Sequence, residues 1–285
     1  MTHTALISAP ALQLALQAPG ADCLVLDCSF DLADPAAGRR AFEAGHLPGA
    51  QYVSLDDTLS GAKTGRNGRH PLPDRATFAQ ALAALGVNAG TQVVACDGMG
   101  GMYAARLWWM LRWAGHANVA VLDGGLAAWL AANGAIETGG SVARTPGNFA
   151  LNDSLVTTAG YADVLANIAQ GQRLVIDARA PDRYRGENET LDPVGGRIPG
   201  AVNRFFRDNL APDGRFKPAA ELHADFTAMI GKRVPARLIT QCGSGVTACH
   251  NLLALEVAGL GGAALYAGSW SEWSAQPSAP IVTGP

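Results

Sequence analysis

The apolar stretch at residues 24–27 (LVLD) returns as residues 174–177 (LVID), 150 residues later. Four further matches keep the same order along the chain: residues 6–8 with 155–157, 46–50 with 197–201, 92–95 with 237–240, and 122–125 with 266–269. Their offsets drift only between 144 and 151, as differences in loop length would produce. Ordered matches at a nearly constant offset indicate an internal repeat. The sequence therefore predicts two similar domains, and 285 residues are enough for both.

Each half of the chain alternates short apolar runs with helical patterns. The runs rich in β-branched residues are 23–26, 93–96, 119–122, 174–176, 238–240 and 263–266, and the helical patterns include 75–85, 103–113, 219–230 and 246–258. Strands that alternate with helices predict an α/β fold, in which a mainly parallel sheet is flanked by helices. We expect the first domain at 1–140, a linker rich in Gly, Pro, Ser and Thr at 141–153, and the second domain at 154–285.

Composition excludes several classes of protein. Hydrophobic residues make up 48% of the chain and charged residues 16%, which is typical of packed cores and not of a disordered chain. A net charge of −3 lacks the basic excess of a nucleic-acid-binding protein. No apolar run approaches the roughly 20 residues of a membrane span, no basic segment precedes an apolar stretch at the amino terminus, and five cysteines are too few for a disulfide framework. We therefore expect a cytoplasmic protein with no nucleic-acid or membrane partner.

The segment 240–248 (TQCGSGVTA) runs from a predicted strand into a predicted helix. Ligands bind at the carboxyl ends of strands in such sheets. Gly243 and Gly245 bracket Ser244 and allow backbone N–H groups to turn inward as an anion-binding nest, to which the following helix adds its positive amino-terminal end. We expect the Cys242 thiol to be held there as the thiolate, the nucleophilic form. The alternative is a buried structural cysteine.

Cysteine phosphatases also place a cysteine in a loop between a strand and a helix. Enzymes of that kind resemble one another in an arginine six residues after the cysteine, which binds the phosphoryl oxygens in two-pronged fashion. In this sequence Ala248 stands six residues after Cys242. A phosphate dianion would have no such partner here, so the sequence disfavours a phosphatase.

Residues 242–248 (CGSGVTA) resemble the active loop of the 3-mercaptopyruvate sulfurtransferases, a branch of the tandem rhodanese family. Further segments that resemble this family are Asp177 with its neighbours, 198–201 (IPGA), 268–273 (GSWSEW), 104–111 (AARLWWML) and 121–125 (VLDGG). The resemblance covers nearly the whole chain. It implies two rhodanese-like domains and the transfer of a sulfane sulfur from 3-mercaptopyruvate, through a persulfide on Cys242, to a thiol or cyanide, with release of pyruvate. It implies no cofactor and no metal, and an acceptor such as a thioredoxin or a small thiol.

In the first copy, Asp97 stands at the position that matches Cys242. An aspartate cannot carry a transferable sulfur, and the resemblance implies that the amino-terminal domain is the inactive copy. Cys96 is adjacent, but successive side chains of a strand point to opposite faces. We therefore expect Cys96 to be structural.

The resemblance also implies roles for individual residues. Arg183 matches the arginine that holds the donor's carboxylate and ketone oxygen. The family's proton relay is matched by Ser244, His70 and an aspartate. We expect this aspartate to be Asp56 and not Asp57. The backbone of the loop would stabilise the persulfide; the loop residues concerned are Gly243, Gly245, Val246 and Thr247. Thr247 would cap the helix and donate to sulfur, and the alternative is that it only caps the helix.

One position departs from the family pattern. A second substrate arginine usually follows nine residues after the first, and Asp192 stands there in this sequence. We expect Arg185 or Arg197 to substitute for it.

Two other functions remain open. Thiosulfate sulfurtransferases, the other branch of the tandem family, resemble one another in basic residues directly after the cysteine, and a dianionic donor needs such charges. Here those positions are the uncharged Gly243 and Ser244, which favours the monoanionic keto acid. The non-enzymatic alternative is a rhodanese module that carries a persulfide or binds a partner.

Overall fold

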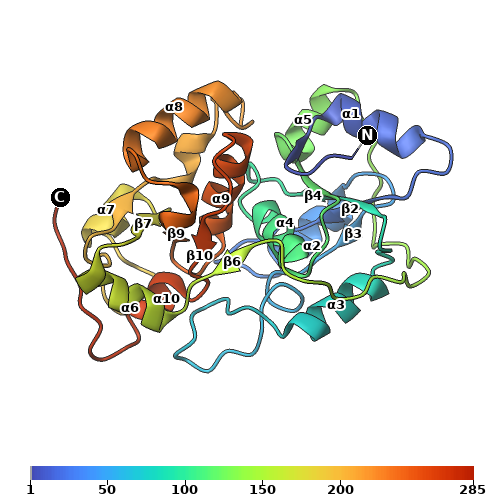
Figure 1. Cartoon of the computed structure of the whole chain (residues 1–285). Coiled ribbons are helices and arrows are strands. Elements are labelled where there is room, and N and C mark those ends of the chain that lie inside the picture. Colours follow the sequence, from blue (N-terminus) through green and yellow to red (C-terminus); the bar gives the residue numbers. More distant parts are fainter. Residues whose placement is uncertain (1) are drawn as a thin grey trace. The chain divides into compact units, whose positions relative to one another are not determined.

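The computed structural model describes residues 2–285 and divides them into two compact units (Figure 1). Unit 1 runs from the amino terminus to Gly61 and also contains Pro73–Leu155 and Pro212–Phe216. The remaining segments, Ala62–Leu72, Val156–Ala211 and Lys217–Pro285, make up unit 2. The short segment Ala62–Leu72 thus belongs with the second copy of the repeat, although it lies in the first half of the sequence.

Unit 1 contains one five-stranded sheet in the order β1-β5-β4-β2-β3, with all neighbours parallel. Its elements are β1 (Leu6–Ile7), α1 (Ala9–Gln17), β2 (Cys23–Asp27), α2 (Ala37–Ala44), β3 (Gln51–Tyr52), α3 (Arg75–Ala84), β4 (Gln92–Cys96), α4 (Ala104–Trp113), β5 (Val119–Leu122) and α5 (Gly125–Ala131). Helix α4 packs against β4 and β5, and α1 packs against α5. The α/β architecture predicted for this half is confirmed.

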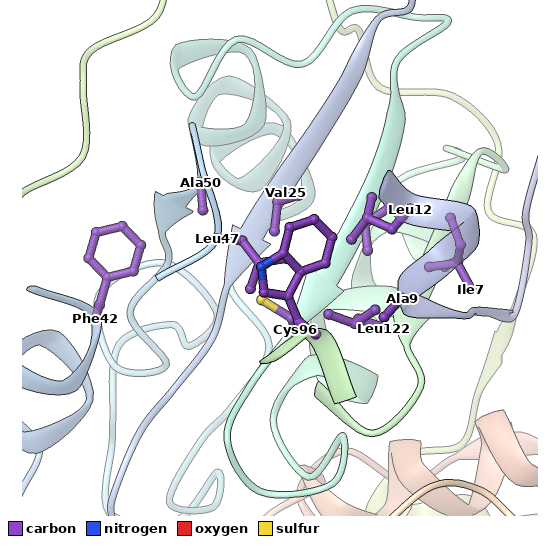
Figure 2. Close-up of a cluster of buried hydrophobic side chains, with 12 residues drawn as sticks. Ile7, Ala9, Leu12, Val25, Phe42, Leu47, Ala50, Cys96 and Leu122 are labelled. Atoms are coloured by element: carbon purple, nitrogen blue, oxygen red, sulfur yellow. The ribbon is translucent and has the colours of Figure 1, made fainter. Parts of the chain in front are cut away.

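A hydrophobic cluster lies between the unit 1 sheet and helices α1, α2 and α5 (Figure 2). Val25 from β2 and Leu122 from β5 meet Leu12 from α1 in this cluster, and all three side chains are buried. Cys96, at the end of β4, also lies among these side chains. Short strands with buried side chains on both faces explain why the sequence shows continuous apolar runs and not alternation.

Unit 2 repeats the same topology, with the strand order β6-β10-β9-β7-β8 and parallel neighbours throughout. Its elements are β6 (Thr157–Thr158), α6 (Tyr161–Gln170), β7 (Leu174–Asp177), α7 (Pro181–Arg185), β8 (Val202–Asn203), the 3₁₀ helix η1 (Phe206–Asn209), α8 (Ala219–Ile230), the 3₁₀ helix η2 (Pro235–Arg237), β9 (Leu238–Gln241), α9 (Thr247–Val257), β10 (Ala264–Leu265) and α10 (Ser269–Trp273). Helix α9 packs on β9 and β10 and contacts α8. The predicted repeat is therefore confirmed at the level of strand order.

One repeat match is wrong by three residues. The sequence comparison pairs Leu6 with Leu155, but Leu6 lies beside Val121 in its sheet, and Leu265, which matches Val121, lies beside Thr158. The true offset at the first strand is therefore 152. The helix caps agree, since Ser8 precedes α1 and Gly160 precedes α6. The mismatch arises because an apolar edge strand in unit 1 is replaced by two exposed threonines in unit 2.

The segment 141–153 is hydrogen-bonded along unit 1. The backbone N–H groups of Gly147 and Asn152 donate to the carbonyl oxygens of Ala83 and Ala114, at 2.8 and 3.0 Å. In addition, the side-chain amide of Gln51 donates to the carbonyl of Val142 at 2.7 Å. Among residues 2–285, no helix combines the length and apolar character that a membrane crossing needs.

Candidate active site

The Cys242 loop connects the end of β9 at Gln241 to the start of α9 at Thr247. Cys242 is 2% exposed, and its Sγ accepts the backbone N–H of Gly245 at 3.1 Å. Gly245 has a φ of +77°, and a Cβ built on it would lie 2.3 Å from the carbonyl oxygen of Ala267. Glycine is therefore required at 245 for the backbone to turn an N–H group toward the sulfur.

Residues at the start of α10 hydrogen-bond to the backbone of the Cys242 loop. Ser269 Oγ accepts the backbone N–H of Cys242 at 3.0 Å and donates to the carbonyl of Tyr266 at 2.8 Å. The N–H groups of Trp270 and Ser271 donate to the carbonyls of Cys242 and Gly243, at 2.9 and 2.8 Å. Ser269 is missing from the predicted site. The only signal for it in the sequence is the resemblance of 268–273 to the family, which assigned it no role.

His70 and Ser244 form the contact that a proton relay needs. His70 Nδ1 lies 2.7 Å from Ser244 Oγ, and both residues are buried. The segment that carries His70 is held to unit 2 next to this contact, because the N–H of Arg69 donates to Ser271 Oγ at 2.9 Å. Gly68 packs so closely that a Cβ on it would lie 2.8 Å from the carbonyl oxygen of Gly268.

Arg183 lies at the same loop. A Cβ built on Gly243 would lie 3.6 Å from both terminal nitrogens of the Arg183 guanidinium. Glu189 holds this guanidinium, with Nη2 donating to both carboxylate oxygens at 2.8 and 2.9 Å. Burial is the largest single influence on the pKa of Glu189 and raises it, but the hydrogen bonds from Arg183 and the Leu191 N–H, together with the charges of Arg183 and Arg179, bring the pKa below its ordinary value. The Arg183 side chain is 19% exposed, which leaves it open to a ligand.

The two arginines expected to assist Arg183 are engaged elsewhere. Arg185 pairs with Glu187, with Nε 2.7 Å from Oε1. Arg197 donates to the carbonyl oxygens of Gly284 and Pro285 and lies over the ring of Tyr184. None of these partners belongs to the Cys242 loop, so the structure does not bring Arg185 or Arg197 into the donor site by any contact it shows.

Arg69 instead reaches the loop. Its Nη2 lies 2.9 Å from the position of a Cβ on Gly243, and its Nη1 pairs with Asp192. The same aspartate accepts from Nη2 of Arg183 at 3.2 Å. Burial raises the pKa of Asp192, and the charge of Arg69 opposes this effect. The sequence gives no signal for this contact, because residues 69 and 243 are far apart along the chain.

A buried ion pair supports the arginine side of the site. Arg179 is 3% exposed, and its Nη2 donates to Asp177 Oδ2 at 2.7 Å and to the Gly196 carbonyl at 2.6 Å. Its guanidinium stacks over the Trp270 ring at 4.4 Å and also contacts Glu189 at 3.5 Å. Sequence reasoning singled out Asp177 at the strand end and missed Arg179 two residues later.

Thr247 does not cap α9, and this part of its expected role is wrong. The helix begins at Thr247 itself, and Val246 holds the N-cap position without a side-chain hydrogen bond. The loop that leads into this helix is held by the N–H groups of Trp270 and Ser271, which donate to the carbonyls of Cys242 and Gly243. Val246 and Thr247 are both nearly buried beside the nucleophile.

Asp56 belongs to unit 1, unlike His70 and Ser244. It lines a pocket of about 280 Å³ together with Arg39, Tyr52 and Asp57. Its part in a relay with His70 remains a prediction.

The matching loop of unit 1 is filled by its own side chain. Oδ1 of Asp97 accepts the N–H groups of Met99 and Gly101 at 2.7 and 2.9 Å, and Oδ2 accepts those of Tyr103 and Ala104 at 2.8 Å each. A carboxylate thus occupies the nest that would otherwise receive an anion. Burial raises the pKa of the neighbouring Cys96 thiol well above its ordinary value, so this cysteine is a poor nucleophile.

Comparisons with known proteins agree with this geometry. The rhodanese-like domain model matches residues 8–132 and 161–276. The chain is 46% identical, over the full length of both proteins, to a probable 3-mercaptopyruvate sulfurtransferase of Pseudomonas aeruginosa. It is 40% identical to a putative thiosulfate sulfurtransferase SseB of Mycobacterium tuberculosis, covering 98% of this chain and 97% of that protein. The solved structure of SseA from Escherichia coli, described among 3-mercaptopyruvate sulfotransferases, superposes with a TM-score of 0.79 at 31% identity, covering 94% of this chain and 99% of that one.

Proposed function

The chain belongs to the rhodanese-like family with two copies of the domain, and from this premise we propose that it is a 3-mercaptopyruvate sulfurtransferase. The observation that carries the proposal is the Cys242 loop, in which a sulfur at the end of β9 accepts a backbone N–H at the start of a helix. The full-length relative at 46% identity supports the choice of donor.

In the first half-reaction, the Cys242 thiolate attacks the sulfur of 3-mercaptopyruvate. The thiolate electron pair forms the new S–S bond, the donor's C–S bond breaks, and its electrons remain with the carbon fragment as the enolate of pyruvate. Arg183 binds the donor's carboxylate and ketone oxygen, because a guanidinium pairs with such oxygens through two parallel hydrogen bonds. The enolate takes a proton and leaves as pyruvate.

The Ser244–His70 pair supplies this proton. Its heavy atoms are 2.7 Å apart, and histidine exchanges protons near neutral pH. Asp56 is proposed to orient His70. The Gly245 N–H, which meets Cys242 Sγ at 3.1 Å, stabilises negative charge on the persulfide.

In the second half-reaction, an acceptor thiolate attacks the outer sulfur and the Cys242 thiolate leaves. A thioredoxin or a small thiol fits this step, and cyanide serves in its place in an assay. A cytoplasmic location suits such an acceptor, because thiols are kept reduced there.

The test compares two donors with the same enzyme preparation. Pyruvate release from 3-mercaptopyruvate and thiocyanate formation from thiosulfate are each measured as kcat/KM. We expect the value for 3-mercaptopyruvate to be the larger, and the reverse ratio would contradict the choice of donor. Thiosulfate sulfurtransferase is the second candidate, because a relative with that name is 40% identical over nearly the whole chain.

A further inference from the structure

Two guanidinium groups meet beside the residue that follows the nucleophile. A Cβ on Gly243 would lie 2.9 Å from Nη2 of Arg69 and 3.6 Å from the terminal nitrogens of Arg183. Nε of Arg69 is buried and has no hydrogen-bond partner among residues 2–285. The Arg69 side chain is 27% exposed, so the site holds a second accessible arginine placed against the backbone of the Cys242 loop.

A single carboxylate bridges these two arginines. Oδ1 of Asp192 pairs with Nη1 of Arg69, and Oδ2 lies 3.2 Å from Nη2 of Arg183. The Asp192 side chain is only 3% exposed. A carboxylate that accepts from two guanidiniums occupies the kind of position that the carboxylate of a ligand would take.

The charges of the surrounding cluster balance. Three guanidiniums, of Arg69, Arg179 and Arg183, are joined by ion pairs to three carboxylates; these are Asp177, Glu189 and Asp192. Asp177 and Glu189 hold Arg179 and Arg183 from within unit 2. Asp192 contributes the negative charge that lies between the two arginines nearest to Gly243.

We propose that Arg69 binds the donor's negative charge together with Arg183, and that Asp192 makes this site selective for a monoanionic α-keto acid over a dianionic donor. The inference rests on the sulfurtransferase function proposed above. Sequence reasoning sought the second arginine at Arg185 or Arg197, whereas the contacts at Gly243 point to Arg69.

The physical basis of the selectivity is the net charge of the site. Electrostatic attraction grows with the charge of the ligand, so a site of balanced charge gives a dianion little advantage over a monoanion. Removal of the Asp192 charge leaves both arginines in place and adds one positive charge. A dianion gains about twice as much from that change as a monoanion does.

The deciding variant is Asp192→Asn, which keeps an amide oxygen to accept from the arginines. We expect the ratio of kcat/KM for thiosulfate to kcat/KM for 3-mercaptopyruvate to rise by about tenfold. The matched control is Asp225→Asn, because Asp225 also bridges two cations of unit 2, Arg204 at 2.9 Å and Lys217 at 3.3 Å. We expect the control to leave the ratio unchanged. An unchanged ratio in a folded Asp192→Asn protein would overturn the proposed role of Asp192.

Arg69 is tested by a second variant with its own control. Arg69→Gln is expected to raise KM for 3-mercaptopyruvate by about tenfold while kcat changes little, because one charge-assisted hydrogen bond to the donor is lost. Arg69→Lys should restore part of the affinity, and Arg66→Gln, an exposed arginine on the same segment, should have no effect. An unchanged KM in Arg69→Gln would overturn the role of Arg69.

The measurements distinguish failure of the proposed function from failure of the Arg69–Asp192 site. If the wild-type protein transfers sulfur from neither donor, the proposed function fails and this inference falls with it. If the wild type turns over 3-mercaptopyruvate but neither variant alters KM or the donor ratio, the function stands and the Arg69–Asp192 site is refuted. Thermal unfolding of each variant confirms that it is folded.

Discussion

Ser269 Oγ accepts the backbone N–H of Cys242 at 3.0 Å, and Ser269 itself has a φ of +54°. The matching residue of unit 1 is Gly125, with a φ of +55°. A β-carbon disfavours this left-handed backbone conformation by about 1 kcal/mol, so the chain retains a strained serine where its own repeat uses glycine. The hydroxyl that this serine supplies fixes the backbone N–H of the nucleophile.

Substitutions at Ser269 separate strain from hydrogen bonding. Ser269→Ala keeps the strain and leaves the buried Cys242 N–H without its partner, whereas Ser269→Gly loses the same hydrogen bond but relieves the backbone. We expect the alanine variant to be less stable than the glycine variant by about 1 kcal/mol, and both to lose kcat. Urea denaturation and sulfur-transfer assays check these expectations. Equal stability of the two variants would show that the backbone is not strained.

His70 is expected to act on the chemical step. His70→Asn removes the proton donor that contacts Ser244, so kcat should fall by about a hundredfold or more while KM changes little. His223→Asn is the control, because His223 lies outside the Cys242 loop and its Nδ1 lies 2.8 Å from the Ala258 carbonyl oxygen. If His70→Asn raised KM and left kcat intact, His70 would be a binding residue and the relay would be wrong.

Asp97 is expected to stabilise unit 1. Its carboxylate accepts four backbone N–H groups, and Asp97→Ala leaves the buried N–H groups of Gly101, Tyr103 and Ala104 without this partner. The free energy of unfolding should fall by about 3 kcal/mol or more. The control is Asp31→Ala, because Asp31 is exposed and its carboxylate accepts the N–H of Ala33 at 2.7 Å. Equal midpoints of urea unfolding for the two variants would contradict this role.

Glu272 is expected to make stability depend on pH. Burial raises the pKa of Glu272 in the folded protein above the ordinary value of 4.5. At pH values between the ordinary pKa and the raised pKa, the folded protein therefore binds more protons than the unfolded chain. The free energy of unfolding therefore falls as the pH rises through this window. Glu272→Gln has no carboxyl group to titrate at this position. The melting temperature of the variant minus that of the wild type should therefore be larger at about pH 8 than at about pH 4. A difference that does not vary with pH would show that Glu272 is not perturbed.

The fold could be predicted because its strands are short, apolar and repeated. The stretches around Val25 and Val175 are buried on both faces, which produces the continuous apolar runs. The sequence match between β1 and β6 was wrong because Thr157 and Thr158 of β6 are exposed and carry no apolar pattern.

The candidate site was only partly predictable. Glycines around Cys242 indicate the loop because they are a local requirement of its backbone. The approach of Arg69 to Gly243 and the support of Cys242 by Ser269 are tertiary contacts between distant segments, and no local pattern encodes them. Arg185 and Arg197 were expected to substitute for the family's second arginine, but Arg185 pairs with Glu187 and Arg197 donates to carbonyl oxygens at the carboxyl end.

The most direct measurement is the mass of the protein after it is mixed with 3-mercaptopyruvate without an acceptor. The account predicts that the wild-type protein gains one sulfur atom on the peptide that contains Cys242, that one equivalent of pyruvate is released, and that cyanide removes the added sulfur. Cys242→Ser should gain no sulfur and release no pyruvate, because an alcohol cannot carry it. Added sulfur on Cys249 or Cys96, or pyruvate release by Cys242→Ser, would contradict the central role of Cys242.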